Sequence, residues 1–152
     1  MKRILAVVTI LGIAASAEAA TYSATGAACE TAYNEGSTYL TEWGVVYNTA
    51  TNWARTIVCP LTTNGNVPYN IEICVIDKNP NQDFTCQVMF QTDAFSAFTG
   101  VLYSSGASAS RQILRWGPMT GWPNARWSIY CYVPMSSAGS LSGVEFYRWS
   151  SN

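Results

Sequence analysis

The sequence predicts an all-β fold, an antiparallel β-sandwich of the jelly-roll or immunoglobulin-like kind with about seven or eight strands. Three observations carry this prediction. Short segments alternate apolar and polar residues, turn residues separate these segments, and helical periodicity is almost absent. Five cysteines in the same chain indicate that disulfides stabilise the sandwich.

Alternation defines most of the strands. Ile71, Ile73 and Val75 share one face of their segment, and in residues 126–133 the apolar side chains alternate with Tyr130 and Tyr132. Turns are expected at residues 64–66 (NGN) and 77–83 (DKNPNQD), which are rich in turn-forming residues. The expected strands are residues 54–59, 69–77, 84–91, 100–104, 112–116, 126–133 and 141–149.

Residues 1–20 have the pattern of a secretory signal peptide, with Lys2 and Arg3 before an apolar run over residues 4–15. Ala17 and Ala19 supply the small residues that a signal peptidase needs. As a helix, this apolar run spans only about 18 Å, which is too short for a bilayer. The sequence therefore predicts a secreted protein, extracellular or periplasmic, with no membrane span after cleavage.

The remainder, residues 21–152, is predicted to form a single β-sandwich domain. No linker, charge run or internal repeat divides it. Residues 21–42 are small and polar with weak strand signals, so we expect a loosely ordered N-terminal segment.

Charge and composition exclude several functions. The chain has 8 basic and 9 acidic residues and no histidine. A nucleic-acid partner is excluded because it needs clustered Lys and Arg, and a catalytic or metal-binding histidine is impossible. Cleavage after residue 20 removes Lys2, Arg3 and Glu18 and leaves hydroxyl, amide and aromatic groups to dominate. Such a surface favours neutral ligands, and no cofactor is expected.

The five cysteines allow two bridges and one free thiol. Strand parity places Cys86 and Cys131 on apolar faces, and Cys59 lies beside Ile57. Cys74 has the opposite parity to its apolar neighbours, so we expect it to be the unpaired thiol. Cys29 would then tie down the N-terminal segment, with the pairing among the four left open. A zinc site is disfavoured because no two cysteines have ligand spacing.

Several segments together resemble a group of uncharacterised secreted bacterial proteins. The segments are 44–48 (GVVYN), 58–61 (VCPL), 71–77 (IEICVID), Cys86 and 130–134 (YCYVP). The likeness covers about residues 29–149 and implies a small, secreted, disulfide-bearing β-sandwich. In that group the isoleucine-rich strand usually lacks a cysteine, so Cys74 departs from the pattern. The resemblance implies no activity.

Aromatic side chains are the main candidates for ligand binding. Tyr130 and Tyr132 alternate on the outward face of one strand, about 6.8 Å apart. Tyr147 and Trp149 share the parity of Glu145 on the last strand. Exposed rings beside hydroxyl and amide groups suit neutral sugars, whereas packing in the core or at an interface is the competing interpretation. The six candidates are Tyr130, Tyr132, Tyr147, Trp149, Trp116 and Trp122.

Two further patterns involve carboxylates. Glu72 and Glu145 lie in the middle of predicted strands and could serve a glycosidase if both faced one cleft. Solvent-facing positions paired with arginine are the favoured interpretation. Asp77, Asn79, Asn81 and Asp83 alternate oxygen side chains in one loop and form a weak calcium candidate. A plain turn is favoured there.

The sequence therefore favours a secreted, non-catalytic protein that binds a ligand or forms part of a surface, with carbohydrate as the favoured ligand class. The first alternative is a structural protein that self-associates through exposed strand edges. The second is a small carboxylate-based glycoside hydrolase.

Overall fold

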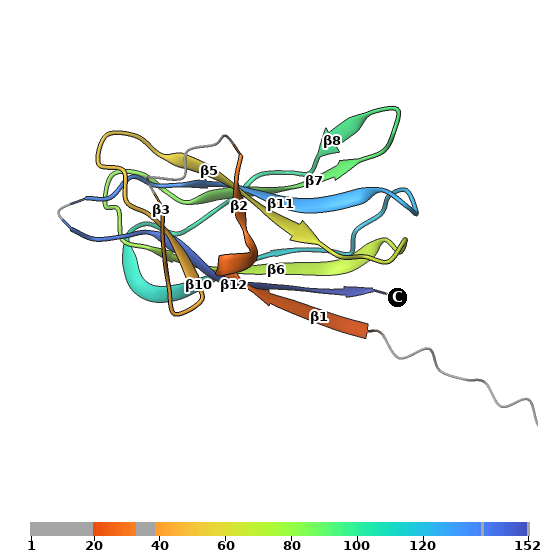
Figure 1. Cartoon of the computed structure of the whole chain (residues 1–152), viewed down its shortest axis with the longest axis horizontal. Coiled ribbons are helices and arrows are strands. Elements are labelled where there is room, and N and C mark those ends of the chain that lie inside the picture. The colour runs from red at the N-terminus through yellow and green to blue at the C-terminus, as the bar shows by residue number, and fades with distance from the viewer. Residues whose placement is uncertain (1–19, 33–38, 138, 152) are drawn as a thin grey trace, which may run out of the picture.

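Alternating strands pack into two antiparallel sheets that lie face to face in a computed structural model (Figure 1), which describes residues 20–32, 39–137 and 139–151. The predicted antiparallel β-sandwich is therefore confirmed. Residues 1–19 of the expected signal peptide lie outside the described residues. No helix in the described part is long and apolar enough to cross a membrane.

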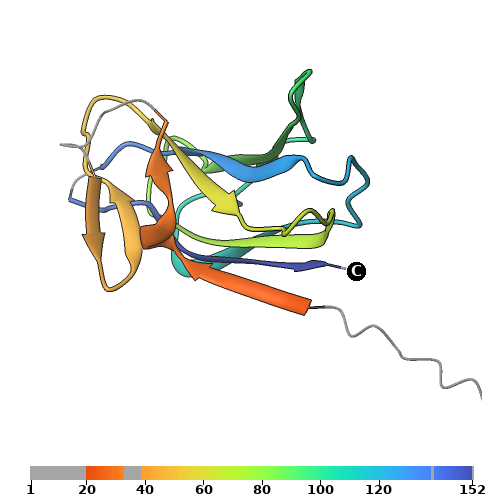
Figure 2. The same ribbon diagram turned by 45° about the vertical axis from the view of Figure 1, so that its right-hand side comes forward.

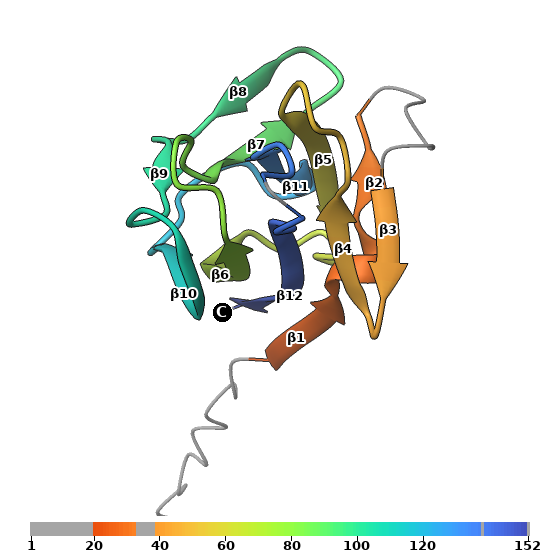
Figure 3. The ribbon, with the colours of Figure 1, turned by 90° about the vertical axis from the view of Figure 1, so that its left-hand side faces the viewer.

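Within the described residues, each sheet contains six strands. Sheet A has the order β10 (Ser108–Trp116), β6 (Pro68–Asp77), β12 (Gly143–Ser151), β4 (Val45–Asn48) and β3 (Tyr39–Glu42), with β1 (Ala20–Thr25) also paired to β12. Sheet B has the order β2 (Glu30–Thr31), β5 (Arg55–Leu61), β11 (Arg126–Val133), β7 (Thr85–Gln91) and β8 (Ser96–Phe98), with β9 (Leu102–Tyr103) also paired to β7. Figure 3 shows the two layers from one end of the sandwich.

Seven of the described strands have six or more residues, and five are shorter. The short strands have only two to four residues, too few for a clear alternation of apolar and polar residues, so the sequence pattern does not predict them. One of them, β8, lies at the end of its sheet and projects from the body of the sandwich (Figure 1).

The N-terminal segment pairs with both sheets. β1 joins sheet A, the 3-10 turn η1 (Gly26–Ala28) crosses over, and β2 joins sheet B (Figure 2). Gly26 permits the crossing, because a Cβ there would lie 1.9 Å from the carbonyl oxygen of Val144. Of residues 21–42, expected to be loosely ordered, residues 21–31 belong to this crossing and residues 39–42 form β3, while residues 33–38 lie outside the described part.

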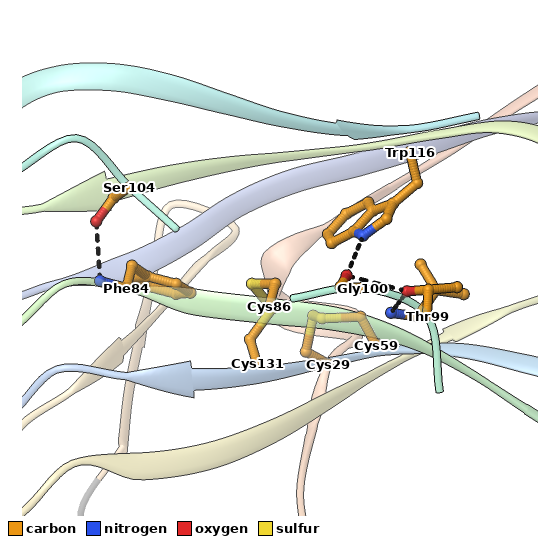
Figure 4. Close-up of a disulfide and its surroundings, with 10 residues drawn as sticks. Cys29, Cys59, Phe84, Cys86, Thr99, Gly100, Ser104, Trp116 and Cys131 are labelled. Atoms are coloured by element: carbon orange, nitrogen blue, oxygen red, sulfur yellow. Dashed lines mark hydrogen bonds between the residues drawn. A yellow bond between two sulfur atoms is a disulfide. The ribbon is translucent and has the colours of Figure 1, made fainter. Parts of the chain in front are cut away.

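Two disulfides cross the interior next to sheet B. Cys29 is bonded to Cys59 and Cys86 to Cys131, while Cys74 is a buried free thiol. Figure 4 shows both bonds side by side in the interior. The first ties the residue before β2 to β5, and the second ties β7 to β11.

A buried carboxylate fastens several connections at one end of the sandwich. Asp77 is fully buried, and its oxygens accept hydrogen bonds from the amides of Asn79 and Phe84 and from the hydroxyls of Ser104 and Ser142. Hydrogen bonds to a charged group stabilise by about 1.5–3 kcal/mol each. Asp77 therefore holds the end of β6 against the segments that lead into β7, β10 and β12.

Removing the Cys86–Cys131 bond should lower the free energy of unfolding substantially. The bond closes a loop with a sequence separation of 45, for which the chain-entropy model gives about 4 kcal/mol. We expect a loss of that size in urea unfolding of the Cys86→Ala/Cys131→Ala variant. Cys74→Ala, which breaks no disulfide, is the control. A double variant within about 1 kcal/mol of the native protein would contradict the prediction.

Candidate functional site

The outer face of sheet B carries the tyrosines that the sequence analysis singled out. β11 lies between β5 and β7, so its outward side chains stand in the middle of the sheet. Tyr130 is in register with Val58 and Gln87. Tyr132 is in register with Thr56 and Thr85. Both tyrosines point away from the core, as the alternation predicted.

Neighbouring strands add further aromatic and apolar side chains to this face. Tyr103 of β9 is in register with Thr85, and Phe98 of β8 with Met89. Phe98 meets Tyr130 edge to face, with ring centroids 6.0 Å apart. Tyr103 is 61% exposed and Tyr132 is 45% exposed. We call this surface the tyrosine face; it consists of Thr56, Thr85, Gln87, Phe98, Val101, Tyr103, Tyr130 and Tyr132.

An open depression of about 240 Å³ lies on the tyrosine face. Its lining residues are Thr56, Thr85, Cys86, Gln87, Val101, Tyr130 and Tyr132. None of these described lining residues carries a charge, and hydroxyl and amide groups supply the polar contacts. The depression is too small to enclose a large ligand, so it suits a neutral molecule that lies along the surface.

The inner side of the sheet keeps the tyrosines in place. Trp127, Ile129, Cys131 and Val133 alternate with them and are buried in the core. The Cys86–Cys131 bond joins β7 to β11 directly beneath the tyrosine face. Because the strands cannot shift against each other, the rings are held in position before a ligand arrives.

Three of the aromatic candidates are at most 8% exposed and belong to the core. Tyr147 is 1% exposed, and burial raises its pKa to about 12. Trp149 is also buried and stacks on Tyr147 and Tyr22. The expectation that both rings face outward with Glu145 is wrong. A register shift between Val144 and Phe146 inserts one residue, so that the side chains after it change faces.

The third of these, Trp116, is buried in the core on β10. Its indole Nε1 donates to the carbonyl oxygen of Gly100 at 3.2 Å (Figure 4). The polar N–H of this buried ring therefore has a hydrogen-bond partner inside the protein. Trp122, the sixth candidate, is half exposed, lies in the loop before β11 and packs against Phe90 and Phe95.

Arginines hold both carboxylates that were considered for catalysis, on the outer face of sheet A. Glu72 pairs with Arg115 and Arg148, and Glu145 pairs with Arg111. Partial burial raises the pKa of Glu72, but the two arginines outweigh it and lower the pKa below its ordinary value. A glycosidase acid needs a raised pKa, so this environment is the opposite of what that chemistry requires.

The free thiol of Cys74 donates a hydrogen bond to the carboxylate of Glu145. Burial is the main cause that raises the pKa of Cys74 to about 11, and the hydrogen bond to Glu145 raises it further. A thiol with that pKa stays protonated near neutral pH and is a poor nucleophile.

The loop considered for calcium forms turns instead. Asp77 and Asn79 are buried, and each accepts a hydrogen bond from the backbone amide two residues later. Asn81 and Asp83 point to the exposed side. Among the described residues, no group of three or more acidic, cysteine or histidine side chains could hold a metal ion.

Comparison with solved structures finds proteins of similar fold. It is similar to the low-affinity xylan-binding module CBM86 from the gut symbiont Roseburia intestinalis, with a TM-score of 0.58, 9% identity, and coverage of 88% of this chain and 96% of that one. A second similar structure is the CBM36-1 domain of a multidomain xylanase from the hindgut metagenome of Trinervitermes trinervoides, with a TM-score of 0.47, 8% identity and coverage of 86% and 96%.

No protein-family model matches the chain, and no curated protein matches its sequence. At 9% identity, the likeness to the xylan-binding module shows a shared β-sandwich fold and no more.

Sequence patterns do not identify every residue of the tyrosine face. Gln87 lies in the strand expected over residues 84–91, and Val101 and Tyr103 lie in the strand expected over residues 100–104, of which the structure keeps only Leu102–Tyr103. Phe98 lies in no expected strand. Only the pairing of β8 and β9 with β7 brings Phe98 and Tyr103 to the tyrosines.

The Glu72 ion pairs make stability depend on pH in a defined direction. Because the pKa of Glu72 is lowered on folding, the ion pairs stabilise the folded protein at pH values above 4.5, the ordinary pKa. This stabilisation is lost as the pH falls through the lowered pKa of the folded state. We expect Glu72→Gln to lower the free energy of unfolding by up to about 1 kcal/mol at pH 7 and by less near pH 3, where Glu72 is increasingly protonated. Urea unfolding at both pH values tests this, with Glu42→Gln on β3 as the control. An equal loss at both pH values would contradict it.

Proposed function

We propose that this protein is a secreted, non-catalytic carbohydrate-binding protein whose ligand lies on the tyrosine face. The observation that carries the proposal is the uncharged, aromatic depression around Tyr130 and Tyr132. Sugar rings have apolar faces that stack on aromatic rings, and their hydroxyls exchange hydrogen bonds at the edges. Gln87, Thr56 and Thr85 place an amide and two hydroxyl groups beside the rings.

The position of this face supports a binding role. It covers the outside of a sheet whose inner side packs into the hydrophobic core and is tied by two disulfides. The fold is similar to that of a xylan-binding module, so xylan is the first polysaccharide to test. Two disulfides are typical of oxidising compartments and agree with export through a signal peptide at residues 1–20.

Chemistry on the ligand is not part of the proposal. Arg115 and Arg148 lower the pKa of Glu72, and Arg111 pairs with Glu145, on the sheet that lies opposite the tyrosine face. Self-association is the other function that an exposed apolar surface supports, since Phe98, Val101 and Tyr103 are all more than 40% exposed.

Loss of one ring should weaken binding without unfolding the protein. We expect Tyr132→Ala to bind soluble xylan, or whichever neutral polysaccharide binds best in a panel, at least about tenfold more weakly, which corresponds to 1.4 kcal/mol. The melting temperature should change little, because the ring is 45% exposed. Affinity gel electrophoresis and calorimetry measure the two quantities.

The matched control is Tyr69→Ala, because Tyr69 is a strand tyrosine that is 39% exposed and lies on sheet A. Its binding should equal that of the native protein. The proposal is wrong if no neutral polysaccharide binds, or if both variants bind equally well. Concentration-dependent oligomers that Tyr132→Ala abolishes, without glycan binding, would favour self-association.

A further inference from the structure

Trp122 is presented at the surface and firmly braced. It is 51% exposed. Its ring stacks on Phe90 with centroids 5.3 Å apart, and Phe95 meets it edge to face at 5.1 Å. Phe90 in turn rests on the buried Trp127. An indole held on one side by other rings and open on the other offers a fixed stacking surface, and little entropy is lost when a ligand covers it.

The backbone around Trp122 is also held in place. The backbone amide of Met119 donates to the carbonyl oxygen of Tyr69 at 2.8 Å, and the backbone amide of Asn124 donates to the carbonyl oxygen of Gly65 at 3.0 Å. Gly121 lies flat on Trp127, where a Cβ would come within 2.8 Å of the indole ring. The loop that carries Trp122 is thus attached to β6, to the turn before it and to the core.

A polar pocket lies in the adjoining turn. Gln91, Thr92, Asp93 and Arg126 line an open depression of about 240 Å³. Thr92 fixes this turn, because its hydroxyl accepts from the amides of Ala94 and Phe95. The same turn therefore places Phe95 against Trp122 and Asp93 in the pocket.

The groups in this pocket suit sugar hydroxyls. Arg126 supplies donors, Asp93 supplies acceptors, and Gln91 and Thr92 can do both. Arg126 forms no ion pair with a carboxylate in the described part of the chain, unlike Arg111, Arg115 and Arg148 on sheet A. Because one positive and one negative group balance, the pocket favours a neutral ligand over an ionic one.

The polar pocket is in line with the tyrosine face. Arg126 begins β11 and is in register with Gln91, and it shares the outward parity of Tyr130 and Tyr132. Six residues separate Arg126 from Tyr132, a distance of about 20 Å along an extended strand. That distance is longer than one sugar ring, so a ligand that reaches both ends must be a chain.

We propose that Trp122 and the Arg126–Asp93 pocket form a second sugar subsite, and that the ligand is a linear, neutral glycan chain that runs in the direction of β11, passes over the buried Ser128 and contacts both ends. This inference rests on the proposed function and specifies the ligand as the interior of an extended chain. A chain long enough to contact both subsites at once should bind more tightly than a short oligosaccharide that contacts only one of them.

Binding to oligosaccharides of increasing length tests the second subsite. The probe is a xylo-oligosaccharide series from disaccharide to hexasaccharide, or the equivalent series of the polysaccharide that binds best, measured by calorimetry. We expect affinity to rise with length in the native protein. Trp122→Ala and Arg126→Gln should reduce affinity for the hexasaccharide by about fivefold or more and leave the shortest bound oligosaccharide unaffected.

Two controls match these variants. Trp53→Ala removes another half-exposed tryptophan, which is 52% exposed and lies before β5, and Arg111→Gln removes an arginine on sheet A. Both should retain the full rise with length. Arg126→Gln changes an exposed side chain, so it tests the subsite even if Trp122→Ala loosens the packing of Phe90.

The outcomes separate the two proposals. If Tyr132→Ala loses binding while Trp122→Ala and Arg126→Gln bind every length normally, the second subsite is wrong and the tyrosine face stands. Affinity that does not change with length also overturns the second subsite. If no oligosaccharide or polysaccharide binds, both proposals fail.

Discussion

The two-residue period of β11 is the constraint on which the rest of the structure depends. Its inward residues form the centre of the core, whereas Tyr130 and Tyr132 face outward onto the proposed binding surface. A slip of one residue would bury Tyr130 and Tyr132 and expose Ile129 and Cys131. The Cys86–Cys131 bond prevents such a slip, because it joins two residues that are directly opposite in the ladder. Stability and the proposed function therefore use the same register.

The outer faces of the two sheets differ in a way that separates their roles. Sheet A carries Glu72, Glu145 and three arginines in ion pairs, which leaves its charges mutually satisfied. The depression on sheet B is lined by rings, hydroxyls and an amide. Charged groups hold water strongly, whereas an uncharged aromatic surface releases it at low cost. A neutral ligand would therefore favour sheet B.

Much of this arrangement could be predicted from the sequence, because alternation reports directly on which face a residue occupies. It placed Tyr130 and Tyr132 outward and set Cys74 apart from the other cysteines. It failed for Tyr147 and Trp149, since the bulge after Val144 adds one residue and reverses the parity that follows. A bulge leaves no local signal in this strand. The second group of side chains around Trp122 was also out of reach, because it depends on contacts between segments that are distant in sequence.

The most direct test of the central claim is an amide chemical-shift map recorded while the protein is titrated with a xylo-oligosaccharide or with the neutral oligosaccharide that binds best. The account predicts that the shifted amides concentrate on β5, β7, β9 and β11 around Tyr130 and Tyr132 and extend toward Arg126 and Trp122. Amides of β6, β10 and β12 around Glu72 should stay unchanged. Shifts centred on sheet A, or none at saturating ligand, would contradict the assignment of the tyrosine face as a carbohydrate-binding surface.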